Sequence, residues 1–82
     1  SDLVFLDLQG RLARQLLALA IDGDGTARTR RVTQGELASM VSGARQTVNQ
    51  VLRSLESRGY IRADGRSFVI LDRERLKLLA ER

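Results

Sequence analysis

Amide and guanidinium side chains recur along one side of the segment 45–57. They are Gln46, Asn49, Gln50 and Arg53, with Arg45 at the flank of the first turn. Asn and Gln can each form two hydrogen bonds with adenine, and Arg two with guanine, at the base edges that line the major groove of DNA. A merely solvated helix face tends instead to carry Glu and Lys pairs. We therefore assign base reading to Arg45, Gln46, Asn49 and Gln50.

A second set of side chains is suited to phosphate. Thr33 and Thr47 lie at the starts of predicted helices, where free backbone amides and the helix dipole attract anions and a hydroxyl adds a donor. A helix cap explains Thr33 without DNA, and the two roles can coexist. Arg66 follows a predicted hairpin tip, where it either reaches a phosphate or is a solvated turn residue. We assign Thr33, Thr47, Arg53 and Arg66 to phosphate contacts.

Two short helices must present these groups. The run Thr33-Gln34-Gly35-Glu36 has the form of a capping box and predicts a helix start. This helix buries Leu37, Ala38 and Val41. The run Ser42-Gly43-Ala44 breaks it, with Gly43 free to adopt a positive φ. Gly59 is a typical stop for the second helix, 45–57.

The second helix has an apolar stripe at the i, i+3, i+4 and i+7 spacing of an amphipathic helix. The stripe consists of Val48, Val51, Leu52 and Leu55. Two short helices joined by a turn that contains glycine are typical of a helix–turn–helix.

Flanking elements complete the predicted domain. A helix over 8–20 is capped by Asp7, a turn occupies 21–26, and 27–32 is a short exposed strand. After the helix pair, strands at 60–62 and 67–71 enclose Asp64-Gly65, a strong hairpin signal. A last helix, capped by Asp72, runs to Glu81 and buries Leu76, Leu79 and Ala80. The predicted fold class is α+β, mainly α: a winged helix–turn–helix with a short β-hairpin wing.

Length and charge are consistent with this interpretation. The 82 residues have no room for a second core, so 1–82 is a single domain. There are 14 basic and 10 acidic residues, a net charge of +4, and nearly all the cations are Arg. The basic excess lies in residues 28–82, where Arg28, Arg30 and Arg31 add long-range attraction. An Arg excess on one part of the chain points to a polyanionic partner, although ordinary solubilising charge explains it about as well.

The composition argues against several other functions. Without Cys or His, the chain lacks disulfides, the usual nucleophile–base pairs and the commonest metal ligands. The run Asp22-Gly23-Asp24-Gly25 lacks the later ligands of a calcium loop and is interpreted as a turn. We predict no enzyme, no catalytic residue, and no metal or cofactor in this domain. The longest apolar run, 16–21, is far shorter than the roughly 20 residues of a membrane span, so the expected location is the cytoplasm.

Sequence-specific binding of duplex DNA is the leading interpretation, with helix 45–57 in the major groove and wing 60–71 on the backbone. One alternative is a winged-helix protein-interaction module that contacts the transcription machinery without reading DNA. Another is an architectural DNA binder with no preferred site. Salt dependence separates the first alternative from DNA binding, because phosphate contacts make affinity fall as salt rises.

The ordered motifs resemble the DNA-binding domain of the Crp/Fnr family of transcription regulators over essentially the whole chain. The matching segments are 3–13 with 16–20, 32–38, 45–52, 59–61 and 64–67. The resemblance implies a bacterial regulator that binds a palindromic site as a homodimer. It implies that an N-terminal sensory domain for a cyclic nucleotide or other signal, and a dimerisation helix, lie outside these residues.

The resemblance also implies residue roles. Arg45, Gln46 and Gln50 match the family's main base-reading positions, and Asp7 matches the hinge that transmits the signal. The loop 21–31 resembles the surface that activators present to RNA polymerase, a candidate partner.

The chain departs from the family pattern at three positions. Gln46 replaces a common acid, Gln50 a common Arg, and Ala44 a common Ser. A bidentate Arg–guanine contact gives about 1–3 kcal/mol of discrimination. We therefore expect a preferred site that differs from the best-known family site.

Overall fold

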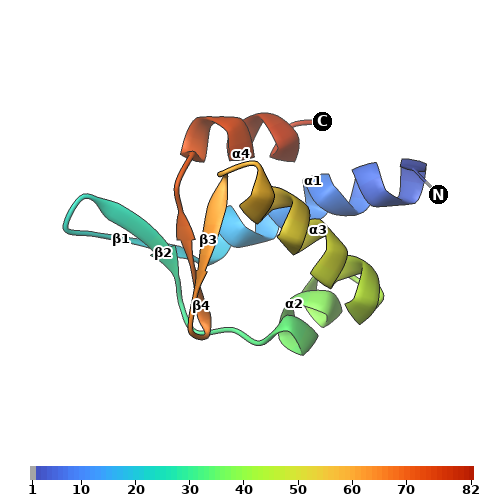
Figure 1. Ribbon diagram of the computed structural model, residues 1–82, viewed down its shortest axis with the longest axis horizontal. Helices are drawn as coiled ribbons and strands as arrows, with labels where there is room; N and C mark the ends of the chain where they lie inside the picture. The colour runs from blue at the N-terminus through green and yellow to red at the C-terminus, as the bar shows by residue number, and fades with distance from the viewer. Residues whose placement is uncertain (1) are drawn as a thin grey trace.

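The computed structural model describes residues 2–82 as four helices and a small antiparallel sheet (Figure 1). The elements in chain order are α1 (Asp2–Leu19), β1 (Ala20–Gly23), β2 (Thr26–Thr29), α2 (Gln34–Met40), α3 (Arg45–Ser57), β3 (Ile61–Asp64), β4 (Ser67–Ile70) and α4 (Arg73–Ala80). This order confirms the predicted winged helix–turn–helix. Within the described residues, no helix combines the length and the apolar character that a bilayer span requires.

Helix α1 begins earlier than predicted, at Asp2 and not at Leu8. Asp7 therefore lies inside the helix, and its predicted capping role is wrong. Its carboxylate instead accepts a hydrogen bond from Arg11 Nε at 3.0 Å, one turn further along. The first turns were missed because Leu3, Val4 and Leu6 are 79, 58 and 51% exposed, so they do not extend the amphipathic pattern of the core-facing residues.

The segment predicted as a turn, 21–26, is largely a hairpin. Strands β1 and β2 pair in the register Ala20↔Thr29 to Gly23↔Thr26, and only Asp24-Gly25 form the turn. Strand β2 ends at Thr29, three residues before the predicted end. There the Thr29 hydroxyl oxygen accepts a hydrogen bond from the Phe68 amide at 3.0 Å, so a side chain ends the ladder between β2 and β4.

The sheet has the order β1-β2-β4-β3, with all neighbours antiparallel. The wing, the hairpin of β3 and β4, pairs Asp64 with Ser67, so its central turn residues are Gly65 and Arg66 and not the predicted Asp64-Gly65. Gly65 has a φ of +62°, a conformation that glycine adopts without steric cost. Arg66 therefore lies at the tip of the wing.

One core joins the helices to the inner face of the sheet. Its buried side chains include Leu12 and Leu16 of α1, Leu37 of α2, the predicted stripe Val48, Val51, Leu52 and Leu55 of α3, Ile61 of β3 and Leu76 of α4. Of the residues predicted to face inward from the last helix, Leu76 and Leu79 are buried, whereas Ala80 is only partly so. Each predicted apolar face of the helix pair is confirmed.

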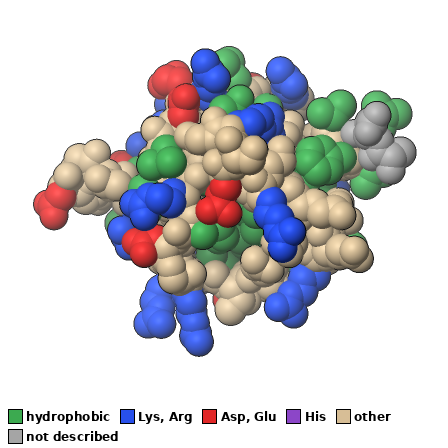
Figure 2. Space-filling model, in the orientation of Figure 1, with side chains coloured by type: hydrophobic (Ala, Val, Ile, Leu, Met, Phe, Trp, Pro, Cys, Tyr) green, Lys and Arg blue, Asp and Glu red, His purple; other side chains and the backbone are tan. Residues whose placement is uncertain are grey.

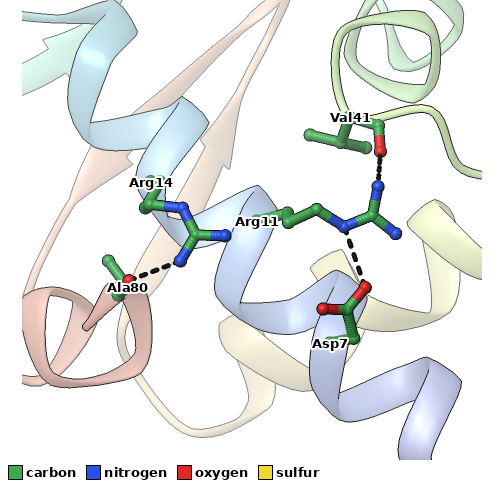
Figure 3. Close-up of polar contacts among 5 residues, drawn as sticks. All are labelled: Asp7, Arg11, Arg14, Val41 and Ala80. Atoms are coloured by element: carbon green, nitrogen blue, oxygen red, sulfur yellow. Dashed lines mark hydrogen bonds and ion pairs between the residues drawn. The ribbon is translucent and has the colours of Figure 1, made fainter. Parts of the chain in front are cut away.

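Polar contacts from α1 hold the C-terminal ends of α2 and α4 (Figure 3). The Arg11 guanidinium, paired with Asp7, donates to the carbonyl oxygen of Val41, the C-cap of α2. Arg14 Nη1 donates to the Ala80 carbonyl oxygen at 2.6 Å, at the end of α4. Helix C-termini expose carbonyl groups that lack partners within the helix, and these two arginines satisfy one at each helix.

Candidate nucleic-acid interface

Helix α2 starts with a complete capping box. The Thr33 hydroxyl oxygen accepts from the Glu36 amide at 3.0 Å, and the Glu36 carboxylate accepts from the Thr33 amide at 2.9 Å. The hydrogen bond from the Thr33 amide lowers the pKa of Glu36 from its ordinary value. Desolvation opposes this shift of the pKa, and the Thr33 hydroxyl and the charge of Arg30 reinforce it. The box therefore satisfies two backbone amides at the start of α2.

The turn between α2 and α3 differs from the prediction in one residue. Ser42 adopts the left-handed conformation with a φ of +54°, whereas the positive φ predicted for Gly43 is wrong. Gly43 is required for space instead, because a Cβ there would lie 2.8 Å from Leu8 Cδ1. The turn therefore packs against α1 and fixes where α3 begins.

Helix α3 has the predicted bounds, Arg45–Ser57, and presents a polar outer face. Arg45, Gln46, Gln50 and Arg53 are exposed, whereas Thr47 and Asn49 are partly buried. Its N-cap, Ala44, makes no side-chain hydrogen bond to the first turn, so the backbone amides there keep their donor capacity. The helix thus presents the side chains that were predicted to read bases and free backbone amides at the same end.

Several of the predicted phosphate ligands meet in one place. A hollow between the α2 N-terminus, α3 and the wing is lined by Thr33, Gln34, Asn49, Arg53, Glu56 and Arg66, with Val32, Leu52 and Phe68 among its apolar residues. Figure 2 shows hydrophobic side chains at the bottom of this hollow and basic side chains around it. We name it the wing hollow. Thr47, Arg45, Gln46 and Gln50 do not line it.

Two contacts hold the wing at this hollow. The Val32 amide donates to the Arg66 carbonyl oxygen at 2.7 Å, which ties the wing tip to the residue before the α2 cap. The Glu56 carboxylate of α3 accepts from the Ala63 amide of edge strand β3 at 2.8 Å. This role of Glu56 was not predicted, because no spacing rule connects a helix carboxylate with the backbone of a later strand.

The basic side chains divide into paired and unpaired groups. Arg28 forms an ion pair with Asp64 at 2.9 Å, and Arg73 one with Asp22 at 3.0 Å. Among residues 2–82, none of the ion pairs involves Arg45, Arg53 or Arg66. The guanidinium groups nearest the polar face of α3 and the wing tip are therefore available to an anionic partner.

Gln34 is the second residue that the sequence analysis missed. Its Nε2 donates to Asn49 Oδ1 at 3.4 Å and so joins the start of α2 to the outer side of α3. Asn49 consequently differs from Gln46 and Gln50, which are exposed. The two positions are 15 residues apart, so only the packing of α2 against α3 reveals the contact.

Comparison with known proteins agrees with this geometry. Residues 10–79 match the model of the Crp-like helix-turn-helix domain. The chain is 43% identical to a CRP-like cAMP-activated global transcriptional regulator of Mycobacterium tuberculosis over 93% of its length, and 36% identical to the cAMP-activated global transcriptional regulator Vfr of Pseudomonas aeruginosa over 85%. It spans only 36 and 35% of these two relatives.

Solved structures give the same result. The reduced CO-sensing protein of R. rubrum superposes with a TM-score of 0.88 at 32% identity, over 96% of this chain and 38% of that one. A CRP/FNR-family transcriptional regulator of Thermus thermophilus superposes with a TM-score of 0.81 at 35% identity, over 90% of this chain and 40% of that one. These relatives are named as sensors and transcription regulators, which agrees with the expectation that the domain is not an enzyme. The chain belongs to the Crp-like helix-turn-helix family and is a DNA-binding domain of the Crp/Fnr type.

Proposed function

We propose that the domain reads a specific sequence in duplex DNA by placing α3 in the major groove and the wing on the adjacent backbone. The observation that carries this proposal is the exposed row of Arg45, Gln46 and Gln50 along the N-terminal half of α3. Recognition helices contact bases with this end, and these side-chain types match base edges. Thr33, Thr47, Arg53 and Arg66 supply the phosphate contacts that set the position of the helix.

Features of the whole protein extend this proposal. The relatives are more than twice as long as this chain, and several are named as cAMP-activated regulators. We expect the domain to act in a homodimer on a palindromic site, in the cytoplasm, under the control of a separate signal-binding domain. Asp7 would belong to the hinge between the two parts, and its pairing with Arg11, which contacts Val41, connects it with the end of α2. The β1–β2 hairpin is the candidate contact for RNA polymerase.

The test is selection of bound duplexes from a random DNA pool, followed by affinity measurements on the recovered site. The isolated domain should bind weakly, because it lacks the avidity of a dimer. Arg45→Ala should lose about 1–3 kcal/mol of discrimination at one base pair. Arg66→Ala should weaken binding to all sequences about equally and lower the salt dependence.

Two results would contradict the proposal. If Arg45→Ala weakens all sequences equally, Arg45 does not read a base. If the wild-type domain shows little salt dependence on any duplex, the protein-interaction alternative accounts for the fold better.

A further inference from the structure

Among the four side chains predicted to read bases, only that of Asn49 already makes a hydrogen bond within the described part of the domain. Its Oδ1 accepts the hydrogen bond from Gln34 Nε2, and the residue is partly buried, whereas Gln46 and Gln50 are exposed. Both Gln34 and Asn49 line the wing hollow. The side chain of Asn49 is therefore oriented by α2 before any DNA arrives.

This orientation restricts what Asn49 can recognise. An Asn amide has one carbonyl acceptor and one amino group with two donor hydrogens. Pairing with adenine uses the carbonyl for the adenine amino group and the amino group for N7. The bond from Gln34 occupies one of the two lone pairs of the carbonyl oxygen and directs that oxygen toward α2. Within residues 2–82 the amino group has no hydrogen-bond partner, so it is the part of Asn49 that remains free to donate.

The surroundings of Asn49 indicate the acceptor that the amino group would meet. Thr33, Arg53 and Arg66 also line the wing hollow. The carboxylate of Glu56 is there too, but it accepts the Ala63 amide. Donors and cations that converge on one place favour an anionic oxygen. A phosphate of the DNA backbone is the anion that lies beside a major-groove helix.

We infer that Gln34 is a positioning residue that holds Asn49 as a phosphate donor, so that Asn49 fixes the register of α3 on the backbone and does not read a base. The inference rests on the proposed function and refines it. It divides the outer face of α3 into two groups. The reading row, which contacts bases, consists of Arg45, Gln46 and Gln50. The anchoring side, which contacts phosphate, consists of Asn49 and Arg53. Gln34 acts through Asn49.

The experiment compares the sequence preference and the affinity of variants of the 82-residue chain with wild type. Asn49→Ala should weaken binding to every duplex about tenfold, the effect of one hydrogen bond to a charged group. Gln34→Ala should weaken it about threefold, as for a neutral hydrogen bond. If Gln34 acts only through Asn49, the double variant should bind no more weakly than Asn49→Ala alone.

Asn49→Asp and Gln46→Ala make the test sharper. An Asp that faces a base accepts from the cytosine amino group and would create a preference for cytosine. An Asp that faces phosphate should only weaken binding, on all sequences alike. Gln46→Ala is the matched control, an amide on the same helix whose loss should alter the selected sequence. Sequence preference does not depend on the folded fraction, so an unstable variant still gives a result.

Three outcomes are distinguishable. Unchanged selected sequences for Gln34→Ala, Asn49→Ala and Asn49→Asp, with uniformly weaker binding, support the inference. A base preference lost in Asn49→Ala, or a cytosine gained in Asn49→Asp, overturns it and makes Asn49 a base reader while the proposed function stands. If the wild type itself selects no sequence, the proposed function fails and the inference fails with it.

Discussion

Gly43 of the helix–turn–helix lies so close to Leu8 of α1 that a Cβ on residue 43 would be 2.8 Å from Leu8 Cδ1 and 3.2 Å from Cδ2. Leu8 is only 2% exposed and is part of the core. The same added atom would lie 3.3 Å from Val48 Cγ2 of α3. The absence of a side chain at Gly43 therefore lets Leu8 of α1 and Val48 of α3 both approach this turn closely.

Gly43→Ala should lower the free energy of unfolding by about 1–3 kcal/mol, because an extra methyl group in a packed core forces its neighbours to shift. Urea unfolding measures the change. The double variant with Leu8→Val, which shortens the opposing side chain, should lose less free energy of unfolding than the two single variants lose in sum. Gly35→Ala is the control, since its nearest neighbour, Thr33 Oγ1, is 3.9 Å away, and it should not destabilise the domain.

Ser42→Gly should raise the free energy of unfolding by about 1 kcal/mol. Ser42 has a φ of +54°, and residues with a Cβ are strained in the left-handed region. The matched control is Ser39→Gly, three residues earlier within α2, which should lower stability by about 0.5 kcal/mol because glycine is a poor helix former. If the free energy of unfolding changes in the same direction in both variants, the assignment of strain to Ser42 is wrong.

These two neighbouring residues show why the sequence predicted the turn but not its details. A glycine within a break is the usual candidate for a positive φ, yet the packing against Leu8 reserves Gly43 for a close approach and leaves Ser42 in the strained conformation. Which of two adjacent residues carries the strain depends on a contact with α1, more than 30 residues away. Local patterns contain no information about that contact.

Helix α3 was predicted to the residue because three local signals agree: the apolar stripe, the break before Arg45 and the stop at Gly59, whose φ is +77°. The outer face follows directly from that periodicity, so the exposure of Arg45, Gln46 and Gln50 was predictable, whereas the partial burial of Asn49 was not. The wing hollow was not, because it brings together side chains from α2, α3 and the wing. The start of α1 was missed for a different reason, since its exposed Leu3, Val4 and Leu6 give no amphipathic signal.

The capping box of α2 should make stability depend on pH. The pKa of Glu36 is lowered in the folded domain, so its ionised form stabilises the fold. That stabilisation is fully present above the ordinary pKa of a glutamate and is lost as the pH falls through the lowered, folded-state pKa. Glu36→Gln, which keeps the geometry of the box, should therefore melt at a lower temperature than wild type near neutral pH, and the difference should vanish in acid.

Thermal unfolding followed by circular dichroism over a pH series tests this prediction. The control is Glu74→Gln in the first turn of α4, where the cap Asp72 accepts from the Arg75 amide and Glu74 has no reciprocal role like that of Glu36. A pH-independent difference between wild type and Glu36→Gln would show that the carboxylate charge does not contribute.

Ala44→Ser should stabilise the domain and strengthen DNA binding together. Ala44 is the N-cap of α3 in extended conformation, with φ −66° and ψ 137°, and makes no side-chain hydrogen bond. A serine hydroxyl there would accept from a first-turn amide and raise the free energy of unfolding by about 1 kcal/mol. The same hydroxyl keeps its proton to donate to a phosphate at the helix N-terminus, so affinity should rise on all sequences alike.

Ala18→Ser, on the exposed side of α1, adds the same hydroxyl without a cap and should instead lower stability by about 0.5 kcal/mol. If Ala44→Ser changes the preferred sequence, position 44 faces a base and the N-terminus of α3 enters the groove more deeply than proposed.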